Sequence, residues 1–504
     1  MKSDRPVLSD LAFFGLLLAA LISTAGGHVV GGDEETMFRV TQNLLAGRGL
    51  AVGREMITIP AQDASLFLPD TPEPFWTTSA VPGRGGYTYS KYGIGQSLAA
   101  VPLYLLGGIG GGLLTPENHS QPEGWAARLA VSMLNPLALA GCGWLLVRFG
   151  RALGYRTSTS RWIALAAIFT SMAWPYVKTF YPQPGVMFLV LGAVYMAYRW
   201  RGTLDQHWLW GLSLACGAAI LFRLSTIIIL PAIVLYLTLA APAHRRWDWI
   251  LPLAVGVAAA LGVTAGYNWL RFGSIFTTGY DEIAWTTPAI LGLYGLLVGP
   301  GKGILLYAPM LILGVAAWDL FARQHRAEFW LFTGLWLSYL AFYAPYNFWT
   351  GGFNWGPRFL LPVLPLAFLP LGVLLEDRNT RLARVLFATF FIIGLIVQIP
   401  AILVDHSRYL FQSFAGADIS QAYGQTILSV EHSPIVRQWP VALDLLKAYS
   451  QTETWQQATL SLQAIADHAP DVPNGQALLQ SEFLRRNTLD FWWLHIVLLC
   501  QLKG

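Results

Sequence analysis

The chain has 504 residues, of which 55% are hydrophobic and 12% are charged, and its net charge at pH 7 is +4. A soluble domain carries roughly 25% charged residues, so a soluble globular protein, a disordered chain and a nucleic-acid-binding protein are excluded. The mean hydropathy of +0.48 and the 21 tryptophans, 20 tyrosines and 27 phenylalanines indicate an integral membrane protein, in which aromatic rings lie at the headgroup level.

Apolar runs long enough to cross a bilayer recur along the chain. The first covers residues 8–26, and we interpret it as a retained span rather than a cleaved signal peptide, because no A-x-A cleavage site follows it. About eleven transmembrane helices are predicted, at 8–26, 125–147, 162–177, 184–198, 208–221, 225–240, 249–269, 304–321, 329–346, 358–375 and 385–404.

A twelfth apolar run, 94–114, is also long enough to span. If it does not cross, fifteen basic residues gather in the loops on the side of the N-terminus, and only five lie in the short loops opposite. If it does cross, this bias reverses, against the rule that basic residues stay on the cytoplasmic side. We therefore predict that 94–114 lies on or dips into the outer leaflet, with a cytoplasmic N-terminus.

This topology predicts two domains. Residues 1–404 form a transmembrane domain with a large extracytoplasmic first loop, at about 27–124, and residues 405–504 form a mainly helical extracytoplasmic tail. The protein is thus predicted to be an all-α polytopic membrane protein.

The first loop opens with three adjacent acids, Asp33, Glu34 and Glu35, after two glycines. Acids suit a helix start, and aspartate is a good N-cap. An apolar stripe follows at helical spacing and predicts an amphipathic helix at the interface. The acids serve either as caps alone or as functional groups just outside the membrane, since three acids exceed what a cap needs.

Several basic residues lie on the outer side, against the topological bias. A charge at membrane depth is costly and points to a cavity or ligand, such as a lipid-linked phosphate held by charge-assisted bonds. Snorkelling to ordinary headgroups is the alternative. The Gly299-Pro300-Gly301-Lys302-Gly303 run lacks the spacing of a phosphate-binding loop. The candidate phosphate ligands are Lys91, Arg128, Arg223 and Arg358.

Three outer loops, at 87–93, 267–273 and 346–358, are rich in aromatic residues, glycine and asparagine. Rings stack on sugar faces and amides bond hydroxyls, although an interfacial aromatic belt has the same composition. The candidate sugar or acceptor ligands are Tyr89, Tyr92, Asn347, Trp349, Asn354 and Trp355. The three cysteines and nine histidines show no metal-binding spacing, so no metal site is predicted.

These features together resemble the GT-C glycosyltransferases, in the group of the protein O-mannosyltransferases and aminoarabinose lipid A transferases. The likeness rests on one span, an acidic start to an amphipathic helix with "NLLAGRGL", an aromatic-Lys motif, and "YNWLRFGS", "GLYGLLVGPGKGILLYAP" and "FNWGPRFLLPVLP". It covers about residues 8–404 and implies a GT-C-like bundle.

The resemblance implies an inverting transfer of a sugar from a polyprenyl-phosphate carrier to a hydroxyl of a glycan, lipid or protein, on the outer face of a bacterial plasma membrane. It implies that Asp33 is the catalytic base and that Glu34 is the family's following acid. Lys91, in Ser90-Lys91-Tyr92, stands where relatives carry Lys-Pro or His-Pro, and Arg128 matches a family arginine. No cofactor is expected, and a monophosphate donor does not oblige a divalent metal.

Two alternatives remain open from the sequence. One is a transporter or flippase of lipid-linked sugars, a class that often shows internal repeats and intramembrane acids; neither is visible here. The other is a non-catalytic membrane subunit.

Overall fold

The computed structural model describes residues 5–54, 58–59, 75–76, 79–114, 125–240, 242–280, 284–376, 381–414, 419–468 and 475–501. Helices dominate it. They are α1 (Arg5–Ser23), α2 (Gly32–Leu45), α4 (Ile94–Leu114), α5 (Trp125–Ser132), α6 (Leu134–Ala152), α7 (Thr157–Phe169), α8 (Gln183–Thr203), α9 (Gln206–Phe222), α10 (Leu230–Ala240), α11 (Ile250–Phe272), α12 (Ala289–Leu297), α13 (Ile304–Tyr307), α14 (Met310–Ala316), α15 (Trp318–Gln324), α16 (Arg326–Tyr343), α17 (Leu371–Glu376), α18 (Arg381–Leu403), α19 (Ser407–Phe414), α20 (Ile419–Leu428), α21 (Pro434–Tyr449), α22 (Thr452–His468), α23 (Gly475–Asn487) and α24 (Trp492–Gln501).

Short 3₁₀ helices and strands complete the fold. The 3₁₀ helices are η1 (Arg84–Gly86), η2 (Trp174–Lys178), η3 (Leu224–Ile229), η4 (Ala243–Arg245) and η5 (Arg358–Ala367). All the strands in the described residues lie in the first loop. One antiparallel sheet has the order β1 (Ala51–Gly53), β5 (Thr88–Tyr89), β4 (Val81–Pro82), and β2 (Thr58–Ile59) pairs with β3 (Phe75–Trp76).

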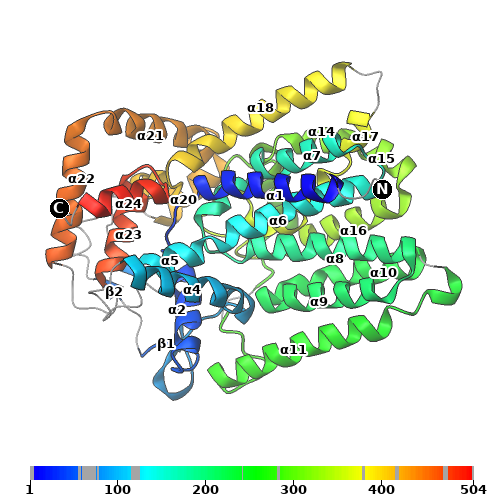
Figure 1. The fold of residues 1–504 in the computed structure, drawn as a ribbon, viewed down its shortest axis with the longest axis horizontal. Coiled ribbons are helices and arrows are strands. Elements are labelled where there is room, and N and C mark those ends of the chain that lie inside the picture. Colours follow the sequence, from blue (N-terminus) through cyan, green and yellow to red (C-terminus); the bar gives the residue numbers. More distant parts are fainter. Residues whose placement is uncertain are drawn as a thin grey trace.

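The long helices form a bundle in which α1 contacts α6, α6 contacts α8, α8 contacts α9 and α9 contacts α11. Figure 1 shows these helices running roughly parallel across the view. Their shared core includes leucines, valines and alanines with no exposed surface. Among the described residues, four helices are long and apolar enough to cross a membrane, at Trp125–Ala152, Ala243–Phe272, Arg358–Glu376 and Arg381–Leu403. The all-α polytopic fold is confirmed, whereas eleven crossings remain a prediction.

The first loop and the tail lie at the same end of this bundle, opposite the N-terminus (Figure 1). There α2 packs on α4, and α4 packs on α5 and on the end of α9. The tail is tied to α1, because the backbone N–H of Trp492 donates to Ala25 O at 3.0 Å and its indole N–H donates to Ile22 O at 2.8 Å. Residues 94–114 form one helix, α4, and its position relative to a bilayer remains a prediction.

One predicted span differs in detail. Residues 304–321 form three short helices rather than one, with breaks at residues 308–309 and at Ala317. Pro309 has no N–H to donate and disfavours a helical conformation at Ala308, whose φ and ψ are −147° and 69°. Prolines at positions 362 and 365 likewise accompany the 3₁₀ geometry of η5.

Candidate functional site

The three acids that begin α2 point to three different environments. The N-cap of the helix is Gly31, with φ of 95°, so aspartate is not the cap that the sequence led us to expect. Gly32 lies against Ser79, and a Cβ there would approach Ser79 Oγ to 2.3 Å. With Gly31 as the cap, the carboxylates of the first turn are free for other partners.

Glu35 is fully buried in an ion-pair network. Its carboxylate accepts from Arg39 Nε at 2.7 Å and from both terminal nitrogens of Arg128, at 2.6 and 3.1 Å. Burial alone raises the pKa of Glu35, but the charges and hydrogen bonds of Arg128 and Arg39 outweigh it and hold that pKa below its ordinary value. Arg128, predicted as a phosphate ligand, also donates to Val29 O and is 1% exposed. The structure therefore gives Arg128 a structural partner and leaves it out of the cavity described below.

Glu34 is turned toward the tail. Burial raises its pKa well above the ordinary value, although a hydrogen bond from the Phe180 backbone N–H and the charge of Arg485 oppose this. Asp405 lies close enough to raise it further. Its surroundings are those of an interior group at the contact between α2 and the tail.

Asp33 is the acid that faces the aromatic-Lys loop. Its carboxylate lies near the Tyr92 hydroxyl, and burial together with this negative charge raises the pKa of Tyr92. Asp33 also interacts electrostatically with Tyr280 and Arg358. The structure thus brings together two segments that are nearly sixty residues apart, together with an arginine more than three hundred residues away.

Arg358 is a buried cation without an acidic ion-pair partner in the part of the chain that the structure describes. Its guanidinium lies over the rings of Tyr181 and Phe359, 5.1 and 5.2 Å from their centroids, and its buried Nε has no hydrogen-bond partner. A buried unpaired charge is costly. An anion supplied from outside the chain would satisfy it.

A cavity of about 280 Å³ opens beside Tyr92. Lys91 and Arg223 line it, and within the described residues neither forms an ion pair with an acid. Lys91 lies 5.7 Å from the ring centroids of Tyr92 and Tyr280. Arg223 donates to Ser225 Oγ at 3.0 Å and to the Tyr343 hydroxyl at 3.3 Å. The rest of the wall is largely apolar and aromatic, with Ile220, Phe222, Leu224, Ile227, Trp285 and Phe342.

A third lining cation, Arg271, is already engaged. It donates to Asn268 Oδ1 at 2.7 Å, to Ser90 O and to Tyr92 O. These carbonyls flank Lys91, so Arg271 holds the loop that presents Lys91 to the cavity. The sequence did not single out this role, nor the cavity tyrosines Tyr280 and Tyr343, because tyrosines abound in every outer loop.

The predicted sugar or acceptor ligands do not gather in one place. Tyr92 lines the cavity, whereas the Tyr89 hydroxyl donates to Arg84 O and Trp349 is buried against Gly295. Asn354 donates to Gly351 O, and Trp355, 1% exposed, donates to Gln398 Oε1. Asn347 is exposed and pairs with Ala284. The side chains of Tyr89, Asn347, Asn354 and Trp355 thus have hydrogen-bond partners inside the protein. In the described residues, no group of three His, Cys, Asp or Glu side chains is arranged to hold a metal.

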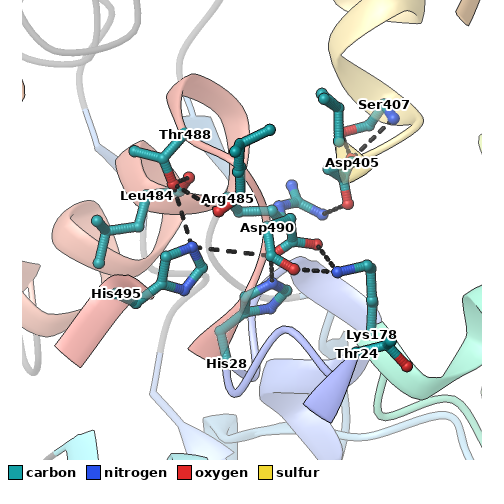
Figure 2. Close-up of polar contacts among 12 residues, drawn as sticks. Thr24, His28, Lys178, Asp405, Ser407, Leu484, Arg485, Thr488, Asp490 and His495 are labelled. Atoms are coloured by element: carbon teal, nitrogen blue, oxygen red, sulfur yellow. Dashed lines mark hydrogen bonds and ion pairs between the residues drawn. The ribbon is translucent and has the colours of Figure 1, made fainter. Parts of the chain in front are cut away.

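The tail contributes a buried polar cluster that contacts the segment before α2 (Figure 2). Asp490, with no exposed surface, accepts from His28 Nε2 at 2.7 Å and lies 3.5 Å from Lys178 Nζ. His495 lies 3.9 Å from the same carboxylate and 3.1 Å from Thr488 Oγ1. Because His28 precedes α2 by only a few residues, this cluster couples the tail to the segment that carries Asp33.

This cluster predicts a pH-dependent stability. The pKa of His495 is lowered from its ordinary value of 6.5 to about 3, mainly because the ring is buried. Between these pH values His495 is protonated in the unfolded chain but not in the folded chain. The free energy of unfolding therefore decreases as the pH is lowered, by at most about 1.4 kcal/mol per pH unit. The pKa of Asp490, lowered by Lys178 and His28 despite burial, adds a further loss only below about pH 4.

Thermal unfolding between pH 7 and 4 measures this effect. His495→Gln is expected to flatten the decline, and substitution of the exposed His207 by glutamine is the matched control. Equal slopes in the wild type and in His495→Gln would contradict the assignment.

Comparison with known proteins gives one likeness of fold. No family model and no curated protein matches the sequence. The structure is similar to the crystal structure of ArnT from Cupriavidus metallidurans bound to undecaprenyl phosphate, with a TM-score of 0.52 and 14% identity, over 96% of this chain and 86% of that one. The expected GT-C-like fold is confirmed, and at this identity the likeness concerns architecture alone.

Proposed function

We propose that this chain is a membrane glycosyltransferase that moves a sugar from a polyprenyl-phosphate carrier to an acceptor hydroxyl, with inversion, on the extracytoplasmic face of a bacterial plasma membrane. The observation that carries the proposal is the position of Asp33 next to Tyr92, which lines the cavity. Lys91 and Arg223, which form no ion pair among the described residues, line the same cavity, and Arg358 is close by. The ArnT structure was solved with undecaprenyl phosphate, which supports a ligand of this class.

In this proposal Asp33 is the general base. It takes the proton of the acceptor hydroxyl as the new C–O bond forms at the anomeric carbon and the bond to the carrier phosphate breaks. Such proton transfer contributes about 10²–10⁴-fold to rate. A single carboxylate is sufficient when the acceptor attacks the anomeric carbon directly, from the face opposite the leaving phosphate.

The leaving group carries the second requirement. Polyprenyl phosphate departs as an anion, and fixed cations stabilise the charge that grows on it. Lys91, Arg223 and Arg358 supply three positive charges without reorganisation, because Arg223 is held by Ser225 and Tyr343 and Arg358 by two rings. Pockets for small ligands usually measure ~300–1,000 Å³. In this proposal the cavity beside Tyr92, of about 280 Å³, holds the phosphate and the start of the prenyl chain, and the remainder of the prenyl chain lies in the lipid bilayer.

Replacing Arg223 by glutamine tests the donor site. The variant loses a charge-assisted bond to phosphate, worth about 1.5–3 kcal/mol, so the affinity for undecaprenyl phosphate is expected to fall roughly ten- to a hundredfold. Binding to the purified protein and the donor KM are the measurements. The matched control is Arg148→Gln, which removes an exposed arginine on α6.

The same preparation separates the alternatives. A transferase converts a polyprenyl-phosphate sugar and an acceptor into a glycosylated product of the expected mass. Flux of a lipid-linked sugar across vesicles without such a product would favour a flippase, and normal donor binding by Arg223→Gln would contradict the placement of the donor phosphate.

A further inference from the structure

The Gly299-Pro300-Gly301-Lys302-Gly303 turn, between α12 and α13, has a lysine whose surroundings are unusual. Lys302 is 4% exposed, and its Nζ donates to the backbone carbonyls of Gly352, Asn354 and Gly356, at 2.8, 2.5 and 3.4 Å. An ammonium group has three protons to donate, so its capacity is filled by one short loop. This lysine is therefore not a free cation for phosphate.

The loop that Lys302 holds, residues 351–356, packs against Arg358. Gly351, Gly352 and Gly356 have φ of 71°, 78° and 69°, a left-handed conformation that side chains disfavour. A Cβ on Gly351 would lie 2.9 Å from Arg358 Cγ and 3.0 Å from its Nε. The carbonyl of Gly356 accepts from Lys302 Nζ and also from the Arg358 backbone N–H, at 3.1 Å. Lys302 and Arg358 are thus joined through a single carbonyl.

Hydrogen bonds to the tail and to Tyr307 hold the turn at residues 299–303 in place. Gly301 N–H donates to Ile427 O at 2.9 Å, and the Ser433 hydroxyl donates to Pro300 O at 2.6 Å, both from the tail. The Tyr307 hydroxyl donates to Gly301 O at 2.9 Å. The chain of contacts runs from the tail through the turn to the loop and ends at the buried arginine near Asp33.

We propose that Lys302 is a positioning residue, which holds loop 351–356 in the conformation that seats Arg358 beside Asp33 and Tyr92. The turn thereby acts on the donor phosphate through Arg358 without touching it. The proposal rests on the proposed function insofar as Arg358 faces the donor. Its structural half, that Lys302 orders the loop, stands on the contacts alone.

The test uses the full chain in detergent or nanodiscs, with undecaprenyl phosphate as the probe. Lys302→Met is expected to speed amide hydrogen exchange in peptides spanning 348–360 and to raise the donor KM and Kd about ten- to a hundredfold, as a displaced catalytic contact does. The acceptor KM is expected to stay unchanged. In an Arg358→Met background, Lys302→Met is expected to add little further loss of donor affinity.

Gly351→Ala provides a second route if Lys302→Met does not fold. It leaves Lys302 intact and displaces Arg358, so the same donor-specific defect is expected, again absent from the Arg358→Met background. Gly47→Ala is the matched control, because Gly47 also has a positive φ, of 66°, but no atom lies within 4 Å of its added Cβ.

The outcomes separate the two proposals. Unchanged hydrogen exchange in Lys302→Met, or a full additional loss of donor affinity in the Arg358→Met background, would overturn the role of Lys302. Faster exchange in Lys302→Met, with normal donor binding by Arg358→Met, would retain the loop-ordering role and overturn the placement of the donor phosphate at Arg358.

Discussion

Asp33→Asn is expected to lower kcat for sugar transfer by about 10²–10⁴-fold while the protein still folds and enters the membrane. Asparagine keeps the size of the side chain and an oxygen near the Tyr92 hydroxyl, so the local structure survives, but the amide cannot take a proton from the acceptor. Donor binding is expected to change little, because the cations of the cavity are untouched. The measurement is product formation with a panel of polyprenyl-phosphate sugars and the purified variant.

Two further variants make this result specific. Asp319→Asn removes an exposed carboxylate that pairs with Arg323 at the surface and is expected to leave transfer unchanged. Glu34→Gln alters the acid that faces the tail and Phe180, and is expected to affect stability more than kcat. Full activity of Asp33→Asn would overturn its assignment as the base, and a greater loss of kcat in Glu34→Gln would transfer that role to Glu34.

Arg128→Met is expected to destabilise the protein by about 3–5 kcal/mol, the typical cost of leaving a buried charge without its partner. The variant strands the carboxylate of Glu35, which Arg128 binds with both terminal nitrogens, and leaves it only Arg39. Glu35 is fully buried, so water cannot compensate. Thermal or denaturant unfolding in detergent measures the loss.

The double variant Arg128→Met/Glu35→Met is expected to recover part of this stability, since it removes both charges. Arg323→Met, which breaks the exposed pair with Asp319, is expected to cost about 0–1 kcal/mol. A stable Arg128→Met protein that no longer binds undecaprenyl phosphate would contradict the structural role and restore Arg128 as a phosphate ligand.

The local features of the site were predictable from the sequence. The acidic start of α2 and its amphipathic stripe follow from composition and helical spacing. The outer basic residues stand out because they run against the topological bias. Lys91 and Arg223 were chosen for that reason, and both line the cavity. Their roles in binding remain predictions.

The pairing of those residues was not predictable. Helical spacing relates residues three or four positions apart, whereas Arg128 binds an acid 93 positions away and His28 binds one 462 positions away. Asp33, Glu34 and Glu35 are equivalent in sequence, and their environments differ only because each points to a different packed surface. The tail seemed separate by composition, yet Asp490 and Arg485 reach the segment that carries the acids.

The sequence by itself determined that this is a membrane protein, since so few charges cannot cover a water-exposed surface. It also determined which charged residues stand out, because they lie in segments where charges are rare. Only the tertiary structure decided which of those charges are already neutralised. Glu35 occupies Arg128 and three carbonyls occupy Lys302, whereas Lys91, Arg223 and Arg358 form no ion pair with an acid among the described residues. The reason is physical: the cost of a buried charge depends on the groups within a few ångströms of it, and packing, rather than order along the chain, selects those groups.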